Sequence, residues 1–233
     1  TFRNKYFSSP NGFVNNTIRS EKQACIFIRK TLEAAVEKRV KNTDRDIACL
    51  LSGGLDSSLI ASLVQKYHRK YYPNKKLHTW SIGLKGSEDL IYAKKVADFI
   101  KSEHHSIEID KSEMLSCIEE VIYNIESYDT TSVRASIPNY LISKYIKKYE
   151  DICDAKVIFN GDGSDEVTGG YIYFHYINNI LEFDKECRRL LKDIHYFDVL
   201  RSDRTISGNG LEARTPFLDE VFVRNYFTLP IEL

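Results

Sequence analysis

The sequence of 233 residues has no excess charge of either sign, because its 33 basic and 33 acidic residues cancel. A neutral chain offers no bulk electrostatic field to nucleic acid or to an anionic membrane surface, so we expect neither as a partner. No apolar run approaches the ~20 residues that a transmembrane helix needs, and no signal peptide opens the sequence.

Cysteine and methionine are also scarce. The five cysteines stand at positions 25, 49, 117, 153 and 187, and no two of them form a C-x-x-C pair. This odd and scattered set argues against a disulfide framework or a cysteine zinc site and indicates free thiols in a reducing compartment, so we expect a cytoplasmic protein. The single methionine is Met114 and residue 1 is a threonine, so we expect the chain to be a piece of a longer or processed polypeptide.

The most informative stretch that is present joins a buried strand to a helix. Residues 47–51 form an apolar run of strand length, the turn Ser52-Gly53-Gly54 interrupts it, and a helical pattern opens at Ser57. A strand, a glycine turn and a helix N-terminus together make an anion site, because backbone N–H groups and the helix dipole favour negative charge. Hydroxyl donors are added by Ser52, Ser57 and Ser58. The sequence therefore predicts a phosphate-binding loop at 52–58.

This loop differs from a Walker A motif, because no lysine follows its glycines. Its carboxylate, Asp56, would repel a phosphate unless a divalent cation lay between the two. Mg²⁺ commonly binds one or two carboxylates together with phosphate oxygens, so Asp56 predicts a metal-assisted nucleotide site. A strand–helix turn with ordinary capping serines is the structural alternative.

Strands and helices alternate along the chain. The expected helices cover 20–40, 57–71, 90–100, 112–125 and 136–149, and the expected strands cover 47–51, 77–84, 104–109 and 156–159. This order predicts an α/β fold with a doubly wound parallel sheet and a largely helical C-terminal part over 168–233. Ligands of such sheets bind beyond the carboxyl ends of the strands, where the loops 52–58, 83–89, 126–134 and 160–166 lie. Residues 1–19 indicate a linker or irregular lead-in.

Two adjacent histidines, His104 and His105, fall in the third expected strand. Neighbouring residues of a strand point to opposite faces of the sheet, so we do not expect these two to share a metal. We expect core or edge histidines instead.

A second polar cluster, Asn160-Gly-Asp-Gly-Ser-Asp-Glu166, follows the fourth expected strand. The positions of its glycines and acids do not match an EF-hand. Its glycines allow a close backbone approach, and Asp165 is the natural partner of Asp56 on Mg²⁺, which leaves Asp162 and Glu166 to handle substrate. An ordinary acidic turn is the alternative.

Further along, Arg214 could pair with an acid or a phosphate, or form a structural ion pair with Glu212. The sequence favours neither interpretation.

Taken together, these motifs resemble a known family. The loop SGGLDSS (52–58) is similar to the pyrophosphate loop (PP-loop) of N-type ATP pyrophosphatases, which have the adenine nucleotide α-hydrolase-like fold. Within that group, IESYDTTSVRAS (125–136), NGDGSDEVTGGYIYFH (160–175) and GLEARTPFLD (210–219) resemble the synthetase domain of glutamine-hydrolysing asparagine synthetases. The likeness implies an ATP-binding domain over 20–233 that is truncated at its C-terminus.

The resemblance implies ATP and Mg²⁺ as cofactors, and aspartate and ammonia as substrates, with the ammonia coming from glutamine in the full enzyme. The aspartate side-chain carboxylate would be adenylated, pyrophosphate would leave, and ammonia would give asparagine and AMP. A glutaminase domain or subunit with an N-terminal cysteine is the implied partner, and internal Cys25 cannot replace it.

Site residues carry over from the family by position. ATP would be bound by Leu50, Ser52, Gly53, Gly54, Asp56, Ser57, Ser58, Ile82, Asn160 and Gly161. Thr131, Ser132 and Arg134 match the family's T-T-x-R stretch near the substrate carboxylates. The metal would be held by Asp56 and Asp165, and catalysis would fall to Asp162, Arg134 and Glu166.

The sequence departs from the family pattern at three points. The family usually has S-G-E-G-S-D-E, whereas this chain has Asn160 and Asp162 at the first and third positions of that motif. The glutamate at the third position is associated with forming the adenylate. Asp162 keeps the charge but is one methylene shorter, which changes the position of the carboxylate. A later K-x-x-L-R segment and the glutaminase domain have no counterpart in the sequence. Two alternatives remain: a β-lactam synthetase-like ligase, or a nucleotide-binding homologue with impaired catalysis.

Overall fold

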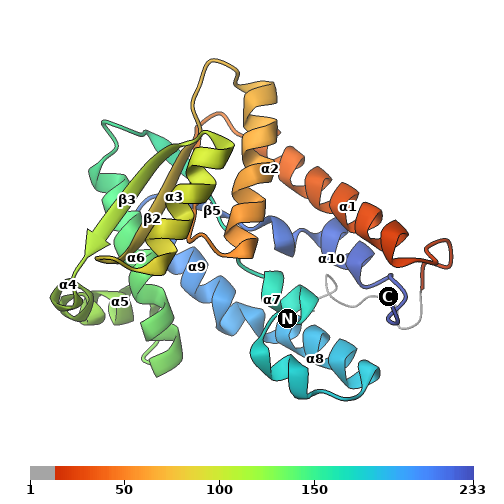
Figure 1. Cartoon of the computed structure of the whole chain (residues 1–233). Coiled ribbons are helices and arrows are strands. Elements are labelled where there is room, and N and C mark those ends of the chain that lie inside the picture. Colours follow the sequence, from red (N-terminus) through yellow and green to blue (C-terminus); the bar gives the residue numbers. More distant parts are fainter. Residues whose placement is uncertain (1–13) are drawn as a thin grey trace.

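The computed structural model describes residues 14–233, so the first part of the expected lead-in over 1–19 lies outside the described residues. A five-stranded parallel sheet forms the centre, in the order β3-β2-β1-β4-β5 (Figure 1). The strands are β1 (Asp46–Leu50), β2 (His78–Leu84), β3 (Glu103–Ile109), β4 (Ala155–Phe159) and β5 (Glu212–Arg214).

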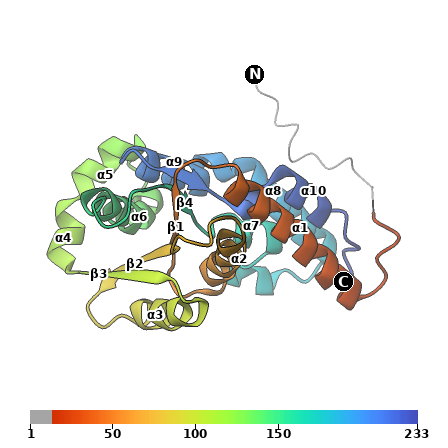
Figure 2. The same ribbon diagram turned by 90° about the horizontal axis from the view of Figure 1, so that it is seen from above.

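Helices cover both faces of this sheet (Figure 2). One face carries α1 (Glu21–Lys41), α2 (Leu55–Tyr71), α3 (Glu88–Ile100) and α10 (Glu220–Tyr226), and the other carries α6 (Thr130–Lys148) and α9 (Asp198–Ser207). Successive side chains of β1 point to opposite faces of the sheet. Ile47 and Cys49 therefore pack in the core on the first face, and Ala48 packs in the core on the second. The predicted α/β class with a doubly wound parallel sheet is confirmed.

The remaining elements of the described residues are four α-helices and three short 3₁₀ helices. They are α4 (Lys111–Ser116), α5 (Ile118–Ile125), α7 (Ser164–Thr168), α8 (Ile180–Asp193) and the 3₁₀ helices η1 (Ile172–Tyr176), η2 (Ile194–Tyr196) and η3 (Pro216–Leu218). Within residues 14–233, no helix combines the length and apolar character needed to cross a bilayer. All five cysteines are free thiols, as expected.

Two expected helices differ from the structure, and one strand of the structure was not expected. The helix expected at 112–125 is two helices that meet at Cys117. Helix α6 begins at Thr130 rather than 136, because the Asp129 carboxylate accepts a hydrogen bond from the Ser132 backbone N–H at 2.8 Å and caps the helix. Strand β5 was not expected, since three residues are too few to show an alternating pattern.

The path of the chain creates a crevice at the carboxyl ends of the strands. From β1 the chain runs outward to β2 and β3, then returns to β4 on the other side of β1 and continues to β5. The order therefore reverses between β1 and β4, and ligands of doubly wound sheets bind beyond the carboxyl ends of the strands at such a point. The loops 52–58 and 160–166 leave the sheet there.

Candidate active site

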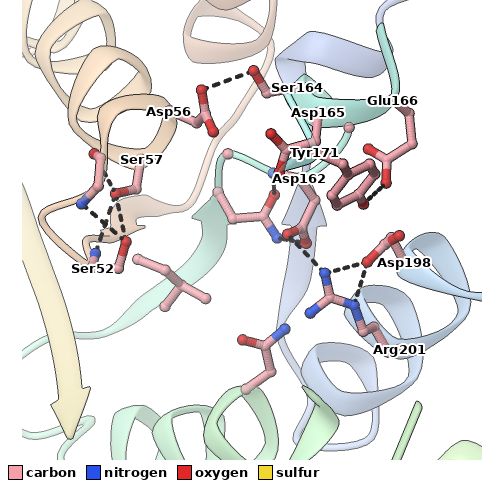
Figure 3. A pocket seen from close by; sticks show the side chains of 16 residues that line it. Ser52, Asp56, Ser57, Asp162, Ser164, Asp165, Glu166, Tyr171, Asp198 and Arg201 are labelled. Atoms are coloured by element: carbon pink, nitrogen blue, oxygen red, sulfur yellow. Dashed lines mark hydrogen bonds and ion pairs between the residues drawn. The ribbon is translucent and has the colours of Figure 1, made fainter. Parts of the chain in front are cut away.

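A cavity lies between these two loops, and α6 and α9 also contribute to its lining (Figure 3). Its lining consists mainly of loop residues and carries both acids and hydroxyls. The lining residues are Leu50, Ser52, Gly54, Asp56, Ser57, Asn139, Asn160, Gly161, Asp162, Gly163, Ser164, Asp165, Glu166, Tyr171, Asp198 and Arg201. The structure thus brings both predicted polar clusters into one site.

The first loop is held in shape by its own serines. The Ser57 hydroxyl accepts from the Ser52 backbone N–H at 3.2 Å and donates to the Gly54 carbonyl at 3.2 Å, and the hydroxyls of Ser52 and Ser57 are 3.0 Å apart. Gly54 is the N-cap of α2, and no side chain caps that helix. The first N–H groups of α2 are therefore available to an anion in the cavity.

Gly53 is held tightly against a neighbouring helix. Its φ of +83° favours glycine, and a Cβ there would lie 2.5 Å from the Ala93 backbone nitrogen and 2.6 Å from the Tyr92 Cβ. Gly53 does not line the cavity. It is required for the loop to pack against α3.

The two loops are in direct contact through Asp56. Its Oδ1 accepts a hydrogen bond from the Ser164 hydroxyl at 2.8 Å. Asp165 lies on the same wall, and its pKa is raised by burial and then by the negative charges of Asp56 and Asp198. Within residues 14–233, neither Asp56 nor Asp165 has an ion-pair partner. The arrangement places two carboxylates close enough to repel each other, which is the condition that a bound cation relieves.

Asp162 lies deeper, beside the only arginine of the cavity lining. Asn160 Nδ2 donates to Asp162 Oδ2 and to the Ser202 hydroxyl, both at 2.8 Å. Arg201 Nη2 lies 3.8 Å from Asp162 Oδ1, and Arg201 Nε donates to Asp198 Oδ1 at 2.6 Å. Burial raises the pKa of Asp162, while the Arg201 charge works in the opposite direction.

Glu166 is a buried carboxyl whose pKa is raised far above its usual range. It is buried, accepts a hydrogen bond from the Tyr171 hydroxyl, and interacts with Asp198. Burial and the bond to Asp198 raise its pKa to about 7, and the Tyr171 bond only partly offsets this. Near neutral pH this carboxyl can both hold and release a proton.

Comparison with known proteins adds to this geometry. The sequence model of the asparagine synthase family matches residues 28–183 and 176–233. The chain belongs to the asparagine synthase family. It is 48% identical over 224 residues to the glutamine-hydrolysing asparagine synthetase of Gallus gallus, which covers 96% of this chain and 38% of that protein. The human relative is 46% identical over 222 residues, covering 95% and 38%.

The chain therefore spans about 38% of the length of these curated relatives. Among solved structures, an NH3-dependent NAD synthetase from Campylobacter jejuni is similar with a TM-score of 0.43 and 18% identity, over 64% of this chain and 60% of that chain. An NMN synthetase from Francisella tularensis gives a TM-score of 0.42 with 14% identity, over 87% and 93%.

Some residues that the asparagine synthase family pattern places in the site lie outside the cavity lining. Ile82 is partly buried and packs between two cores, and Ser58 is likewise partly buried. Thr131 and Arg134 are exposed in the first turns of α6, and Ser132 is buried there. Their predicted contacts with nucleotide or substrate remain predictions.

The ambiguity over Arg214 is resolved by its contacts. Its Nε donates to Glu212 Oε1 at 2.7 Å, and its Nη1 donates to the backbone carbonyls of Arg39 at 2.5 Å and Asn42 at 3.0 Å. Arg214 thus ties β5 to the end of α1 and is structural.

The loop at 83–89 was expected near the ligand, but none of its residues lines the cavity.

Sequence reasoning missed four lining residues of this family member: Asn139, Tyr171, Asp198 and Arg201. Asn139 lies on α6, inside the helix expected at 136–149, where a single asparagine does not indicate a site. Asp198 and Arg201 form a charged i, i+3 pair on α9, which is also typical of a solvated helix face. No local pattern distinguishes a charged pair that lines a site from one on a solvated helix face.

Proposed function

We propose that this chain is the synthetase part of an asparagine synthetase, which converts ATP, aspartate and ammonia to AMP, pyrophosphate and asparagine. The observation that carries the proposal is the meeting of the 52–58 and 160–166 loops at the switch point of the sheet, in a chain of this family. An aspartate side-chain oxygen attacks the α-phosphorus of ATP and the α–β bond breaks. Ammonia then displaces AMP from the activated carboxylate.

The first loop binds the pyrophosphate that leaves. The uncapped N–H groups at the start of α2 and the hydroxyls of Ser52 and Ser57 face the cavity, where they offer donors to negative phosphate oxygens. Leu50, at the end of β1, supplies apolar surface on the same wall for the adenosine. This placement fixes the leaving group in line with the attacking carboxylate.

Asp56 and Asp165 hold the Mg²⁺. Their fit to a cation rests on their mutual repulsion and on the lack of an ion-pair partner for either within residues 14–233. Bound Mg²⁺ would neutralise charge on the phosphate oxygens. The hydrogen bond from Ser164 keeps Asp56 oriented between the two loops.

Asp162 and Glu166 act on the substrate side of the cavity. Arg201 balances the charge of Asp162 and positions it together with Asn160. Glu166, with a pKa of about 7, accepts a proton from ammonia as the new C–N bond forms. Thr131, Ser132 and Arg134 bind the α-carboxylate of aspartate, which requires the substrate to extend from the cavity toward the start of α6.

The full enzyme draws its ammonia from glutamine through a glutaminase domain or subunit, and it acts in the cytoplasm. These parts of the proposal are supported by the names and lengths of the curated relatives and by the free state of all five thiols.

The test is a product analysis of the chain incubated with ATP, Mg²⁺, aspartate and ammonium. Asparagine and AMP in equal amounts are expected. AMP without asparagine would indicate a different acceptor for the activated carboxylate. Bound ATP with neither product, in a chain that circular dichroism shows to be folded, would contradict the proposal.

A further inference from the structure

The opposite end of the sheet holds three side chains that the proposed reaction does not use: His78, Glu103 and His105. They lie where β2 and β3 begin, far along the strands from the carboxyl ends that carry the candidate active site. The parallel register pairs His78 with Glu103 and Trp80 with His105. These four side chains therefore share one face of the sheet, the face that α6 covers. His78, Glu103 and His105 are half-buried, and Trp80 is buried.

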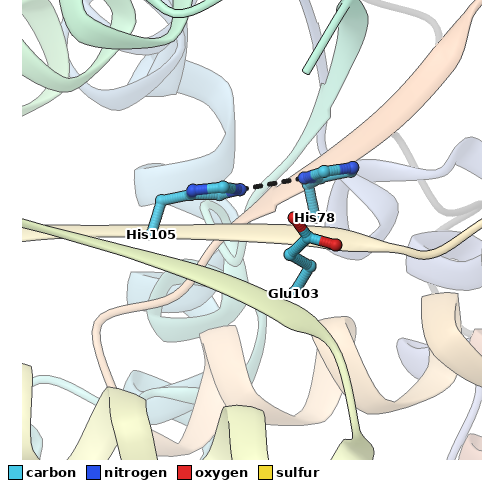
Figure 4. Close-up of side chains that lie close together, drawn as sticks. All are labelled: His78, Glu103 and His105. Atoms are coloured by element: carbon cyan, nitrogen blue, oxygen red, sulfur yellow. Dashed lines mark hydrogen bonds between the residues drawn. The ribbon is translucent and has the colours of Figure 1, made fainter. Parts of the chain in front are cut away.

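The distances between these side chains suit a small cation. His78 Nδ1 on β2 and His105 Nε2 on β3 face each other at 2.9 Å, and the Glu103 carboxylate reaches toward the pair from the start of β3, the strand that also carries His105 (Figure 4). One ligand atom from each of the three residues lies within 4.8 Å of the others. Tetrahedral zinc with bonds of about 2.0–2.1 Å places its ligand atoms about 3.3 Å apart, so small side-chain rotations suffice.

Aromatic packing holds the imidazoles in this orientation. The His105 ring stacks on Trp80 with centroids 4.2 Å apart, and the His78 and His105 rings are nearly parallel, with 7° between their planes. Trp80 is buried and packs in turn against Tyr149 at the end of α6. The ligand pair is thus fixed by the core rather than by a mobile surface loop.

The third ligand, Glu103, is also available to a cation. Glu103 pairs with Lys76 at 3.4 Å, but the Lys76 side chain is 78% exposed. Such an exposed pair is weak, so the Glu103 carboxylate can be recruited by a stronger cation.

We propose that His78, Glu103 and His105 form a binding site for a first-row divalent cation, with Zn²⁺ as the fitting ion and water as its fourth ligand. Two imidazoles and one carboxylate are a common zinc ligand set, whereas Mg²⁺ and Ca²⁺ prefer oxygen ligands alone. The bound ion links the beginnings of β2 and β3. It is independent of the Mg²⁺ proposed at Asp56 and of the ligase activity.

His104 and His105 point to opposite faces of the sheet, as their adjacency in a strand predicts. His104 points to the other face, where its Nδ1 lies 3.0 Å from the Thr79 hydroxyl and its Nε2 lies 3.1 Å from the Ser81 hydroxyl. The cross-strand pair of His78 and His105 is separated by 27 residues, so no short motif reveals it.

Trp80 makes the site directly observable, because it is the single tryptophan of the sequence and stacks on His105. Titration of the chain with Zn²⁺ at pH 7.5 is expected to change Trp80 fluorescence and to saturate at one equivalent. Co²⁺ is expected to quench the same signal. At a Zn²⁺ concentration 100 times the dissociation constant, the melting temperature is expected to rise by roughly 5–10 °C.

Variants H78Q and E103Q each remove one ligand but leave Trp80 and its stacking partner in place. Both are expected to weaken Zn²⁺ binding at least tenfold by the fluorescence readout. The matched control is H175Q, which changes an exposed histidine on η1 and is expected to bind as the wild type does. The proposal is overturned if folded wild type shows no fluorescence response at millimolar Zn²⁺, or if H78Q and E103Q both bind with wild-type affinity.

Discussion

Gly161 lies so close to the first turn of α2 that a Cβ there would be 2.9 Å from the Ser57 backbone nitrogen and 3.0 Å from the Asp56 carbonyl carbon. This contact sets the spacing of the two loops that form the candidate active site. The neighbours are backbone atoms, so they can yield only if one loop moves as a whole. The geometry of the cavity therefore depends on the absence of one methyl group.

Gly161→Ala is expected to force the two loops apart and to lower the rate of pyrophosphate release about 100-fold, because a displacement of about 1 Å is enough for that loss. Stability should fall by only about 1–3 kcal/mol. The matched control is Gly86→Ala, where a Cβ meets nothing within 4 Å, although the φ of +77° adds strain. That control should lose about 1 kcal/mol and keep its rate. Equal rates in both variants would contradict the role of Gly161.

Asp56→Asn should preserve the fold, because the amide oxygen can still accept the hydrogen bond from Ser164. The lost charge is expected to weaken the apparent affinity for Mg²⁺ at least tenfold, measured as pyrophosphate release against Mg²⁺ concentration. Asp89→Asn is the control, since Asp89 also lies in the first turn of a helix but is exposed and outside the cavity lining. An unchanged Mg²⁺ dependence in Asp56→Asn would remove Asp56 from the metal site.

Glu166 should make stability depend on pH. Its folded pKa of about 7 exceeds the ordinary value of 4.5, so between these values the folded state binds more protons than the unfolded state. Stability is then expected to fall as pH rises from about 4.5 to 7, by up to about 3 kcal/mol from this group. Glu166→Gln resembles the protonated acid and should flatten this slope in chemical denaturation.

Glu186→Gln is the matched control for that measurement, because Glu186 also accepts a hydrogen bond from a tyrosine, Tyr173, at 2.7 Å. The pKa of Glu186 is lowered below its ordinary value of 4.5, chiefly by its bond to Arg189, whereas the pKa of Glu166 is raised. The control should leave the slope unchanged. A slope that survives in Glu166→Gln would assign the pH dependence to another group.

Asp219 joins α10 to α1. Its Oδ1 caps α10 by accepting from the Val221 and Phe222 N–H groups, and its Oδ2 lies 2.6 Å from both Lys38 Nζ and Arg39 Nη1. Asp219→Ala is expected to lower the free energy of unfolding by about 2–3 kcal/mol through loss of the cap and the ion pairs. Asp219→Asn keeps a good cap and should lose about half as much.

The cost of Asp219→Ala should itself depend on pH. Burial opposes ionisation, but the bonds from Lys38 and Arg39 outweigh it and hold the pKa of Asp219 at about 2. A lowered folded pKa gives stability that is complete above about pH 4 and is lost as pH falls toward 2. The difference between wild type and Asp219→Ala should shrink over that range. A difference that stays constant from pH 5 to 2 would show that the ion pairs contribute nothing.

Local signals explain which parts of this molecule could be predicted from the sequence. The alternation of strands and helices depends on residues close in the chain, so the parallel sheet and four of its strands follow from the pattern. Both loops of the candidate site were also predicted, because each concentrates glycines, hydroxyls and acids in seven residues directly after an apolar strand. The two loops follow β1 and β4, between which the strand order reverses, so the fold itself brings them together.

The remaining site residues depend on contacts that no local pattern encodes. Arg201 and Asp198 reach the cavity because α9 packs beside α6, and their spacing alone is typical of any exposed helix. The packing of Gly53 on α3 could not be predicted either, because a glycine in a turn has the same local pattern whether it contacts a ligand or a neighbouring helix. Tertiary packing decides such cases.

The central claim is carboxylate activation, and pyrophosphate release from ATP tests it most directly. The chain would be incubated with ATP and Mg²⁺, with and without aspartate, with ammonium as nitrogen donor. The account predicts release that requires aspartate and that is about 100-fold slower in Gly161→Ala. Release that is equal without aspartate, or no release from folded chain that binds ATP, would contradict it.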